Sequence, residues 1–466
     1  MLALSQAGVP AALASATKTA YEKFILASDA GRWDLALKVI DKLVRTGKPD
    51  CDYLCERARV YTELKHYKNA MDDLNAAIKL VPDNAIAHRR RAYLHLIQRH
   101  YREGISDLDL AIRQVGSDPV NVVPLTDYTN RARAYALLGA RRKAAADEPL
   151  ARACDALKQA LDFREASNLK KAEEIANRIV KSNPNMIQAY MVRGLIRLNA
   201  SKNKEALKDL DRVLTMAPDL CTFAYFRADA CIEMGNYPKA IADYSKIIEK
   251  RPRLVLFDYT ANTGRFRQHF EYRDENFVNL ADIYFLRGSC YSRKAQLALA
   301  EKDFSSAIML DAGEWECYFE RGNVRLSQGK PKAAVADYTA CLKLKRDFWD
   351  CLIKRSSAHE KLKENDLAVA DLTSIIKANP ADAGIYLLRA QLFERLKSHD
   401  RALADYTEMI RRAPSDDDGY KARGDLYFKL GRYKKAVADF DRAIKLGSED
   451  KATLLKSRAA ALKKMQ

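Results

Sequence analysis

Apolar and polar residues alternate at helical spacing through most of the chain. In the stretch CTFAYFRADACIEMGNYPKAIADYSKIIEKRP, residues 221–252, apolar residues recur three or four positions apart on both sides of Gly235 and Asn236. Such spacing gives each half one apolar face, and the Gly-Asn pair marks a turn. The pattern predicts two amphipathic helices joined by a short connection.

The same pattern returns with a period of 34 residues, for example in YFERGNVRLSQGKPKAAVADYTACLKL and YKARGDLYFKLGRYKKAVADFDRAIKL. Within a copy, position 4 is often tyrosine, position 8 is Ala or Gly, position 20 is mostly Ala and position 32 is often proline. Small residues let two helices approach closely, and proline ends each unit. We count twelve copies, which start near residues 17, 51, 85, 125, 153, 187, 221, 281, 315, 349, 383 and 417.

These repeats resemble the tetratricopeptide repeat (TPR) family over about nine tenths of the chain. The resemblance implies an all-α fold, a right-handed superhelical solenoid of antiparallel helix pairs in which neighbouring hairpins cover one another. We expect the following organisation: a lead-in at 1–16, repeats 1–7 at 17–252 with irregularity around 119–152, an aromatic and basic insertion at 253–280, repeats 8–12 at 281–450, and a capping helix at 451–466.

Three interruptions break the period. PVNVVP at residues 119–124 separates the third and fourth copies, and Pro149 falls inside the fourth. We expect Pro149 to shorten the second helix of that copy before the fifth begins near residue 153. The insertion carries six aromatic residues, so it packs somewhere, either as a plug in the groove of the array or against a partner.

An arginine occupies position 7 on the otherwise apolar helix in ten of the twelve copies, and an aspartate occupies position 23 in the same ten. The two exceptions coincide, as a pairing requirement would produce. We predict a ladder of partly buried ion pairs, within a repeat or to the next one, because an unpaired guanidinium inside a helix interface is costly. The central members are Arg227 with Asp243, Arg287 with Asp303, and Arg321 with Asp337.

The resemblance also implies a binding surface, since TPR arrays bind partners along the concave surface of their first helices, chiefly through positions 2, 5, 9 and 12. Position 5 is apolar in six successive copies, and an exposed apolar stripe of this extent is typical of an interaction site. An extended peptide or a helix with apolar anchors, possibly acidic, is the expected partner. The predicted groove residues are Met191, Tyr225, Phe285, Phe319, Asn323, Ile353 and Leu387.

The net charge of the chain supports other classes of partner as alternatives. The chain has 80 Lys and Arg against 62 Asp and Glu, a net charge of +18 that favours acidic partners. Residues 88–102 carry a predicted basic patch of Arg89, Arg90, Arg99 and Arg102, which supports RNA binding as one alternative. Docking on an acidic cytoskeletal polymer, such as axonemal microtubules, is another. A co-chaperone role would need the family's Lys/Asn carboxylate clasp, which is incomplete around Asn130 and Asn323.

Enzymatic chemistry finds no support in the sequence. Phosphate-binding loops, dinucleotide fingerprints, zinc-protease and hydrolase motifs are missing, so we expect no catalytic residue, cofactor or metal site. Nine dispersed cysteines without CxxC spacing favour a reducing compartment, and no apolar run is long enough to span a membrane. The lead-in lacks the charges of a targeting signal. The sequence predicts a non-enzymatic, cytoplasmic scaffold.

Overall fold

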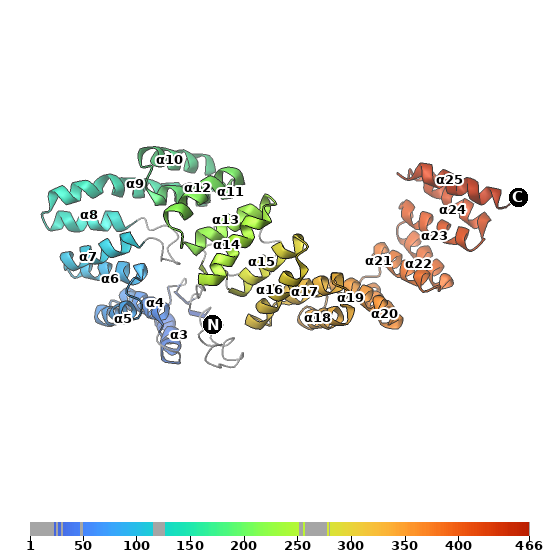
Figure 1. Cartoon of the computed structure of the whole chain (residues 1–466), viewed down its shortest axis with the longest axis horizontal. Coiled ribbons are helices and arrows are strands. Elements are labelled where there is room, and N and C mark those ends of the chain that lie inside the picture. Colours follow the sequence, from blue (N-terminus) through green and yellow to red (C-terminus); the bar gives the residue numbers. More distant parts are fainter. Residues whose placement is uncertain are drawn as a thin grey trace. The chain divides into compact units, whose positions relative to one another are not determined.

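The structure is a computed structural model, and it describes residues 23–24, 27–28, 31–46, 50–114, 126–250, 255–256, 277–278 and 280–465. These residues are almost entirely helical, and consecutive helices pair as antiparallel hairpins (Figure 1). Two short strands, β1 (Val255–Leu256) and β2 (Phe277–Val278), also pair antiparallel. The lead-in at 1–16, the interruption at 119–124 and most of the insertion lie outside the described residues, so the expectations for them stay predictions.

The helices divide between two compact units, residues 1–294 and 295–466. The first unit contains α3 (Trp33–Thr46), α4 (Cys51–Glu63), α5 (Tyr67–Leu80), α6 (Ala85–Ile97), α7 (Tyr101–Arg113), α8 (Asp127–Leu137), α9 (Arg141–Glu165), α10 (Leu169–Ser182), α11 (Ile187–Asn199), α12 (Asn203–Met216), α13 (Cys221–Glu233), α14 (Tyr237–Lys250) and α15 (Leu280–Arg293). The second contains α16 (Leu297–Leu310), α17 (Trp315–Ser327), α18 (Pro331–Leu344), α19 (Trp349–Lys361), α20 (Asn365–Ala378), α21 (Ala383–Arg395), α22 (His399–Arg412), α23 (Asp417–Lys429), α24 (Tyr433–Lys445) and α25 (Lys451–Lys463). The all-α solenoid of paired repeats is confirmed.

Each hairpin turns through one residue with a left-handed backbone. Gly235, between α13 and α14, has a φ of +72°, and the equivalent residue in the third repeat, Arg99, has a φ of +63°. Glycine adopts this conformation without steric cost, whereas a residue with a Cβ is strained there. The turn geometry is therefore set by the repeat and not by the residue that occupies it.

Close helix contacts explain the small residues at position 8. A Cβ placed on Gly322 of α17 would lie 2.6 Å from Cε1 of Tyr338 on α18, and that tyrosine is fully buried. Gly194 of α11 has more room, because the nearest atom to its hypothetical Cβ is 3.5 Å away, at Asp209. The same position thus carries different packing constraints in different repeats.

The fourth and fifth repeats depart from the expected form. We expected Pro149 to shorten a helix there, and this expectation is wrong, because α9 runs without interruption through Arg141–Glu165 with Pro149 inside it. The second helix of repeat 4 and the first helix of repeat 5 are therefore one helix. Alanine-rich flanks with high helix propensity favour the continuous helix over the break that proline usually makes.

The last helix, α25, packs against α24 and buries Leu454 and Ala461. Its arginine Arg458 forms an ion pair with Asp441 of α24. The final hairpin is thus covered by an additional helix, as solenoids generally require. Among the described residues, no helix combines the length and the apolar character that a bilayer-spanning segment needs.

Candidate binding surface

The position-7 arginines hold the position-23 aspartates of their own repeats. In the seventh repeat, Arg227 donates from Nε to Asp243 Oδ2 at 2.9 Å and from Nη2 to Oδ1 at 2.5 Å. In nine repeats, the Nη2–Oδ1 distance lies between 2.5 and 2.8 Å: Arg57–Asp73, Arg91–Asp107, Arg131–Asp147, Arg193–Asp209, Arg227–Asp243, Arg321–Asp337, Arg355–Asp371, Arg389–Asp405 and Arg423–Asp439. Arg287 and Asp303 fall in different units, so their pairing stays a prediction.

The third guanidinium nitrogen, Nη1, reaches back to the preceding repeat. Its acceptor is always the side chain at position 25, which is Asp, Asn, Ser or Thr, at 2.7 to 3.1 Å. The acceptors are Asp41, Asn75, Asp109, Asn177, Asp211, Ser245, Ser305, Thr339, Thr373 and Thr407. Each arginine therefore joins two consecutive repeats, a connection that our sequence analysis missed.

The ladder is interrupted at the fused helix. Pro149 occupies position 25 of repeat 4, and Gln159 and Ile175 occupy positions 7 and 23 of repeat 5. All three partners of the usual bridge are missing together at this junction. Continuous α9 connects these two repeats instead, so the arginine bridge has no role there.

Carboxylates of this chain already accept hydrogen bonds from the guanidinium groups of the position-7 arginines. These arginines are therefore poorly suited to binding phosphate. Burial acts to lower the pKa of Arg227, but its hydrogen bonds with Asp243 and Asp211 outweigh burial and raise the pKa. Asp243 is only 3% exposed. A row of arginines could also bind phosphate groups, but pairing with buried carboxylates gives that function no support in the geometry.

The apolar stripe at position 5 is only partly accessible. Met191, Tyr225 and Phe285 in the first unit are buried, so the expectation that they face solvent is wrong. Neighbouring aromatic rings account for part of this burial, since the Tyr225 ring packs edge-on against Tyr244 with centroids 6.2 Å apart. The half-buried members, Phe319, Ile353 and Leu387, lie on α17, α19 and α21 of the second unit.

Aromatic side chains gather at one end of this accessible row. Phe319 and Trp315 both pack edge-on against Phe348, with centroids 4.8 and 4.6 Å apart. Lys345 places its Nζ 3.8 Å from the centre of the Trp315 ring. Asn323, another predicted groove residue, accepts a hydrogen bond at 2.9 Å from the Tyr338 hydroxyl. Asn323 therefore serves the interior of its own repeat.

The predicted basic patch does not form a single surface. Arg89 is buried and holds Asp127 through Nε at 2.7 Å and Nη2 at 2.9 Å. Arg90 donates to Glu56 Oε1 at 2.8 Å. Arg99 occupies the left-handed turn position, and Arg102 is exposed on α7. The expectation that Arg89 and Arg90 face a ligand is wrong, because both neutralise buried carboxylates of this chain.

A buried carboxyl that our sequence analysis missed lies at position 9 of α13. Asp229 keeps part of its surface exposed, but its Oδ1 is covered and has no hydrogen-bond partner among the described residues. Burial and the nearby Glu233 raise the pKa of Asp229 to about 8. The Tyr244 hydroxyl is likewise buried without a described partner. The equivalent tyrosine of repeat 9, Tyr338, is bonded, so the polar groups of repeat 7 are a local exception.

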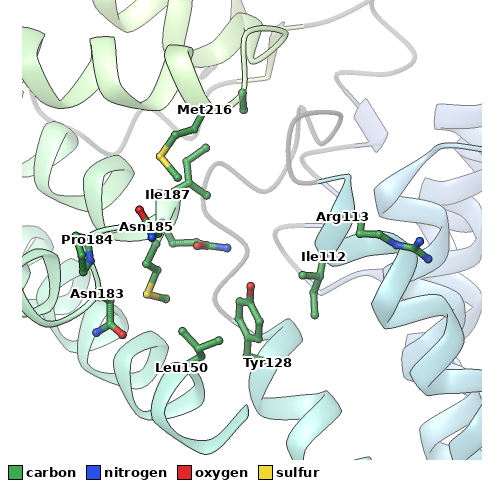
Figure 2. Close-up of a pocket in the computed structure, with 12 residues that line it drawn as sticks. Ile112, Arg113, Tyr128, Leu150, Asn183, Pro184, Asn185, Ile187 and Met216 are labelled. Carbon is green, nitrogen blue, oxygen red and sulfur yellow. The ribbon is translucent and has the colours of Figure 1, made fainter. Parts of the chain in front are cut away.

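A cleft of about 540 Å³ opens in the first unit (Figure 2). Its walls come from α7, α8, α9, the connection between α10 and α11, the start of α11 and the end of α12. Repeats three to six thus meet around one space. No contiguous sequence pattern marks this cleft, and our sequence analysis did not predict it.

Comparisons with known proteins agree with the repeat pattern. Family models described as tetratricopeptide repeat match residues 52–84, 157–220, 197–254, 281–314, 316–348, 353–417 and 418–450. Together these matches cover more than half of the chain.

A curated relative, the DnaJ homolog subfamily C member 7 homolog of Schizosaccharomyces pombe, is 25% identical over 173 residues. The match covers 32% of this chain and 36% of that protein, so the chain spans about a third of its relative's length.

Two solved structures are also similar. The C-terminal part of a TPR repeat-containing protein from Cytophaga hutchinsonii is 16% identical, with a TM-score of 0.45, and the match covers 57% of this chain and 97% of that one. YrrB, described as a TPR protein with an unusual peptide-binding site, is 19% identical with a TM-score of 0.32, over 42% and 97% of the two chains.

Proposed function

The chain belongs to the tetratricopeptide repeat family, and on this basis we propose that it is a non-enzymatic scaffold that binds a segment of a partner protein through the second unit. The proposed surface is the row of Phe319, Ile353 and Leu387 on three successive first helices, α17, α19 and α21. The single observation that carries this proposal is the partial exposure of these large apolar side chains in consecutive repeats. A partner that covers this row removes apolar surface from water, and this removal favours binding.

The spacing suits a partner that presents several apolar anchors in line. One anchor per repeat matches either an amphipathic helix laid in a groove or an extended peptide. The half-buried aromatic group of Trp315, Phe319 and Phe348 lies beside this row, and aromatic residues dominate the energy of many interfaces. Lys345 beside Trp315 adds a positive charge, which favours a carboxylate next to the partner's apolar anchor.

Crosslinking mass spectrometry of the native complex, followed by matched variants, tests this proposal. We expect the double variant Phe319→Ser and Ile353→Ser to weaken binding of the crosslinked partner at least about tenfold, the loss of roughly 1.4 kcal/mol or more. The matched control is Leu367→Ser on α20, a second helix, whose side chain is 51% exposed. Equal binding by the double variant and the parent, at unchanged melting temperature, would contradict the proposal.

A second candidate rests on the charge of the chain. The net charge of +18 supports docking on an acidic cytoskeletal polymer through long-range attraction. Cosedimentation with microtubules tests it. Binding should fall steeply between about 50 and about 300 mM salt, because added salt screens the attraction between the charges of the two partners. RNA binding loses its main sequence support because Arg89 and Arg90 hold internal carboxylates.

A further inference from the structure

Helix α25, which lies beside α24 (Figure 1), has the features of the first helix of a thirteenth repeat. Its Arg458 donates from Nε to Asp441, which occupies position 25 of repeat 12. The same kind of contact joins the position-7 arginines of the array to position 25 of the repeat before them, as in Arg423 with Thr407. With Arg458 at position 7, the thirteenth copy starts at residue 452, one residue later than the period of 34 predicts.

The burial pattern of α25 agrees with this numbering. Leu454 and Ala461, at positions 3 and 10, are buried. Leu455, Ala459 and Leu462, at positions 4, 8 and 11, are exposed, and the two leucines are 47% and 37% exposed. Position 8 is buried in all twelve preceding copies, where it is Phe24, Ala58, Ala92, Ala132, Ala160, Gly194, Ala228, Gly288, Gly322, Ser356, Ala390 and Gly424. The exposed side of α25 is therefore the side that a second helix covers in a complete repeat.

Complete repeats show which groups cover these positions. In repeat 9, Arg325 at position 11 contacts Asp337 at position 23, with Nη1 2.9 Å from Oδ2. Gly322 at position 8 packs against Tyr338 at position 24. In nine copies the second helix has Ala or Gly at position 20, Asp at position 23 and Leu, Tyr or Phe at position 24. A helix with this pattern would fit the exposed side of α25.

Arg458 makes only half of the usual ladder connection. Arg423 uses Nε and Nη2 for Asp439 of its own repeat and Nη1 for the repeat before it. Among the described residues, Arg458 has one hydrogen bond, to Asp441, so its Nη1 and Nη2 are available to a ligand. Residues 451–466 contain five Lys or Arg and no Asp or Glu. This surface therefore favours a partner with carboxylates and disfavours a second copy of itself.

We propose that α25 docks an amphipathic helix of a partner protein, which takes the place of the second helix of repeat 13. The docked helix presents a small residue and, three positions later, an aspartate that is followed by Leu, Tyr or Phe. The aspartate pairs with Arg458, and the large apolar residue covers Ala459 between Leu455 and Leu462. This surface lies on α25 alone, so it does not depend on the row on α17, α19 and α21.

A helical peptide copied from α20 provides the probe, because α20 carries the required pattern in Ala368, Asp371 and Leu372. The peptide spans residues 365–378, and a hydrocarbon staple joins positions 370 and 374, which are exposed in the protein. Free helices of this length are marginal in water, so the staple is needed. In fluorescence anisotropy, we expect the labelled peptide to bind the full chain. A peptide with Asp371→Asn should bind at least about tenfold more weakly, on the scale of a hydrogen bond to a charged group.

Exchanging the two charges separates specific docking from general attraction. Arg458→Glu in the chain should weaken binding of the unmodified peptide at least about tenfold, and a peptide with Asp371→Lys should bind this variant more tightly than the unmodified peptide does. Arg142→Glu, which changes an exposed arginine on α9, is the matched control and should bind like the parent. Leu455→Ser should also weaken binding, because the peptide then covers less apolar surface.

The double variant Phe319→Ser and Ile353→Ser should bind the α20 peptide like the parent. Failure of this inference and failure of the proposed function therefore give different results. Equal affinity of the peptides with and without Asp371→Asn, or no binding of the unmodified peptide up to about 1 mM, would overturn the inference. Dimers of the chain that Leu455→Ser dissociates would also overturn it, since a second copy would then occupy α25.

Discussion

Arg227 donates from Nη1 to Asp211 at 2.8 Å, although the two residues belong to consecutive repeats. The same guanidinium holds Asp243 in its own repeat through its other two nitrogens. One side chain therefore fixes both the closing of a hairpin and its attachment to the previous one. The arginine at position 7 is a structural element of the array, which leaves partner binding to other positions.

The ion pairs of Arg227 with Asp243 and with Asp211 should contribute differently to the free energy of unfolding. Arg227→Ala leaves Asp243 buried without its counter-charge, and we expect a loss of about 3–5 kcal/mol in unfolding free energy. Asp211 is 44% exposed on its side chain, so Asp211→Ala should cost only about 0–1 kcal/mol. Urea unfolding of both variants measures the difference, and equal effects would contradict the assigned burial.

A redundant arginine should protect the sixth repeat. Asp209 receives Nη2 of Arg193 at 2.6 Å and also Nη1 of Arg197 at 2.7 Å. Arg193→Ala should therefore destabilise the protein by at least about 1 kcal/mol less than Arg227→Ala, because a buried carboxylate keeps one ion pair. The double variant Arg193→Ala and Arg197→Ala should exceed the sum of the single losses, as coupled neighbours do. Additive losses would show that Arg197 gives no protection.

Two glycines at the same repeat position should respond oppositely to alanine. Gly322→Ala forces a methyl group to within 2.6 Å of the buried Tyr338 ring, and we expect destabilisation of about 1–3 kcal/mol. Gly194→Ala meets only ordinary contacts at 3.5 Å and should stabilise its helix by up to about 1 kcal/mol. Thermal melts of the two variants test this pair, and a shift in the same direction for both would count against the packing account.

His88 should make stability depend on pH. Its Nδ1 lies 2.8 Å from Asp107 Oδ1 and its Nε2 lies 2.8 Å from the Pro82 carbonyl oxygen, so both nitrogens face acceptors. The hydrogen bond to Asp107 is the main cause that raises the pKa of His88. A raised pKa in the folded state stabilises the protein fully below the unfolded value of about 6.5, and this contribution is lost as the pH rises through the folded value.

The variant His88→Gln isolates this effect. The difference in unfolding free energy between parent and variant should be about 1–3 kcal/mol larger at pH 5.5 than at pH 9, the scale of a hydrogen bond to a charged group. Burial lowers the pKa of His95 and acts in the opposite sense, so the comparison must be with the variant and not with the parent at a second pH. A difference that is independent of pH would show that His88 is not charged in the folded protein.

Asp229 should weaken the fold as the pH rises. Its pKa of about 8 lies far above the unfolded value of about 3.9, so its stabilising contribution is complete only below the unfolded value and declines as the pH rises through the folded one. Asp229→Asn removes the ionisation, and we expect it to gain at least about 1 kcal/mol over the parent between pH 5 and pH 8, on the scale of 1.36 kcal/mol per pKa unit. Carboxyl NMR titration of Asp229 checks the cause directly.

Part of the ladder could be predicted from sequence because two positions vary together. Gln159 and Ile175 replace arginine and aspartate in the same repeat, which reveals a pairing even without coordinates. The acceptor at position 25 was also detectable, since every copy except the fourth, with Pro149, has a short polar side chain there. That signal is weaker because four residue types share the position.

Other features depend on tertiary context. Met191 and Ile353 are both apolar at position 5, yet only Met191 is fully buried, so residue type alone does not distinguish an interior from an interface. Pro149 is ordinarily a helix breaker, and the helix that continues through it reflects the stability of both packed ends. The cleft joins residues as far apart as Ile112 and Met216, which no local pattern can connect.

The uninterrupted α9 has a mechanical consequence. An array of hairpins that is pulled from its two ends in optical tweezers can unfold one hairpin at a time, because a turn separates each hairpin from the next. At α9 there is no such turn, and the helix belongs to both neighbours. The segment from Asp127 to Ser182 should consequently extend as a single event, about twice as long as the extension of one ordinary hairpin. This long event would identify repeats 4 and 5 in the recording, so that the other unfolding events can be assigned relative to it.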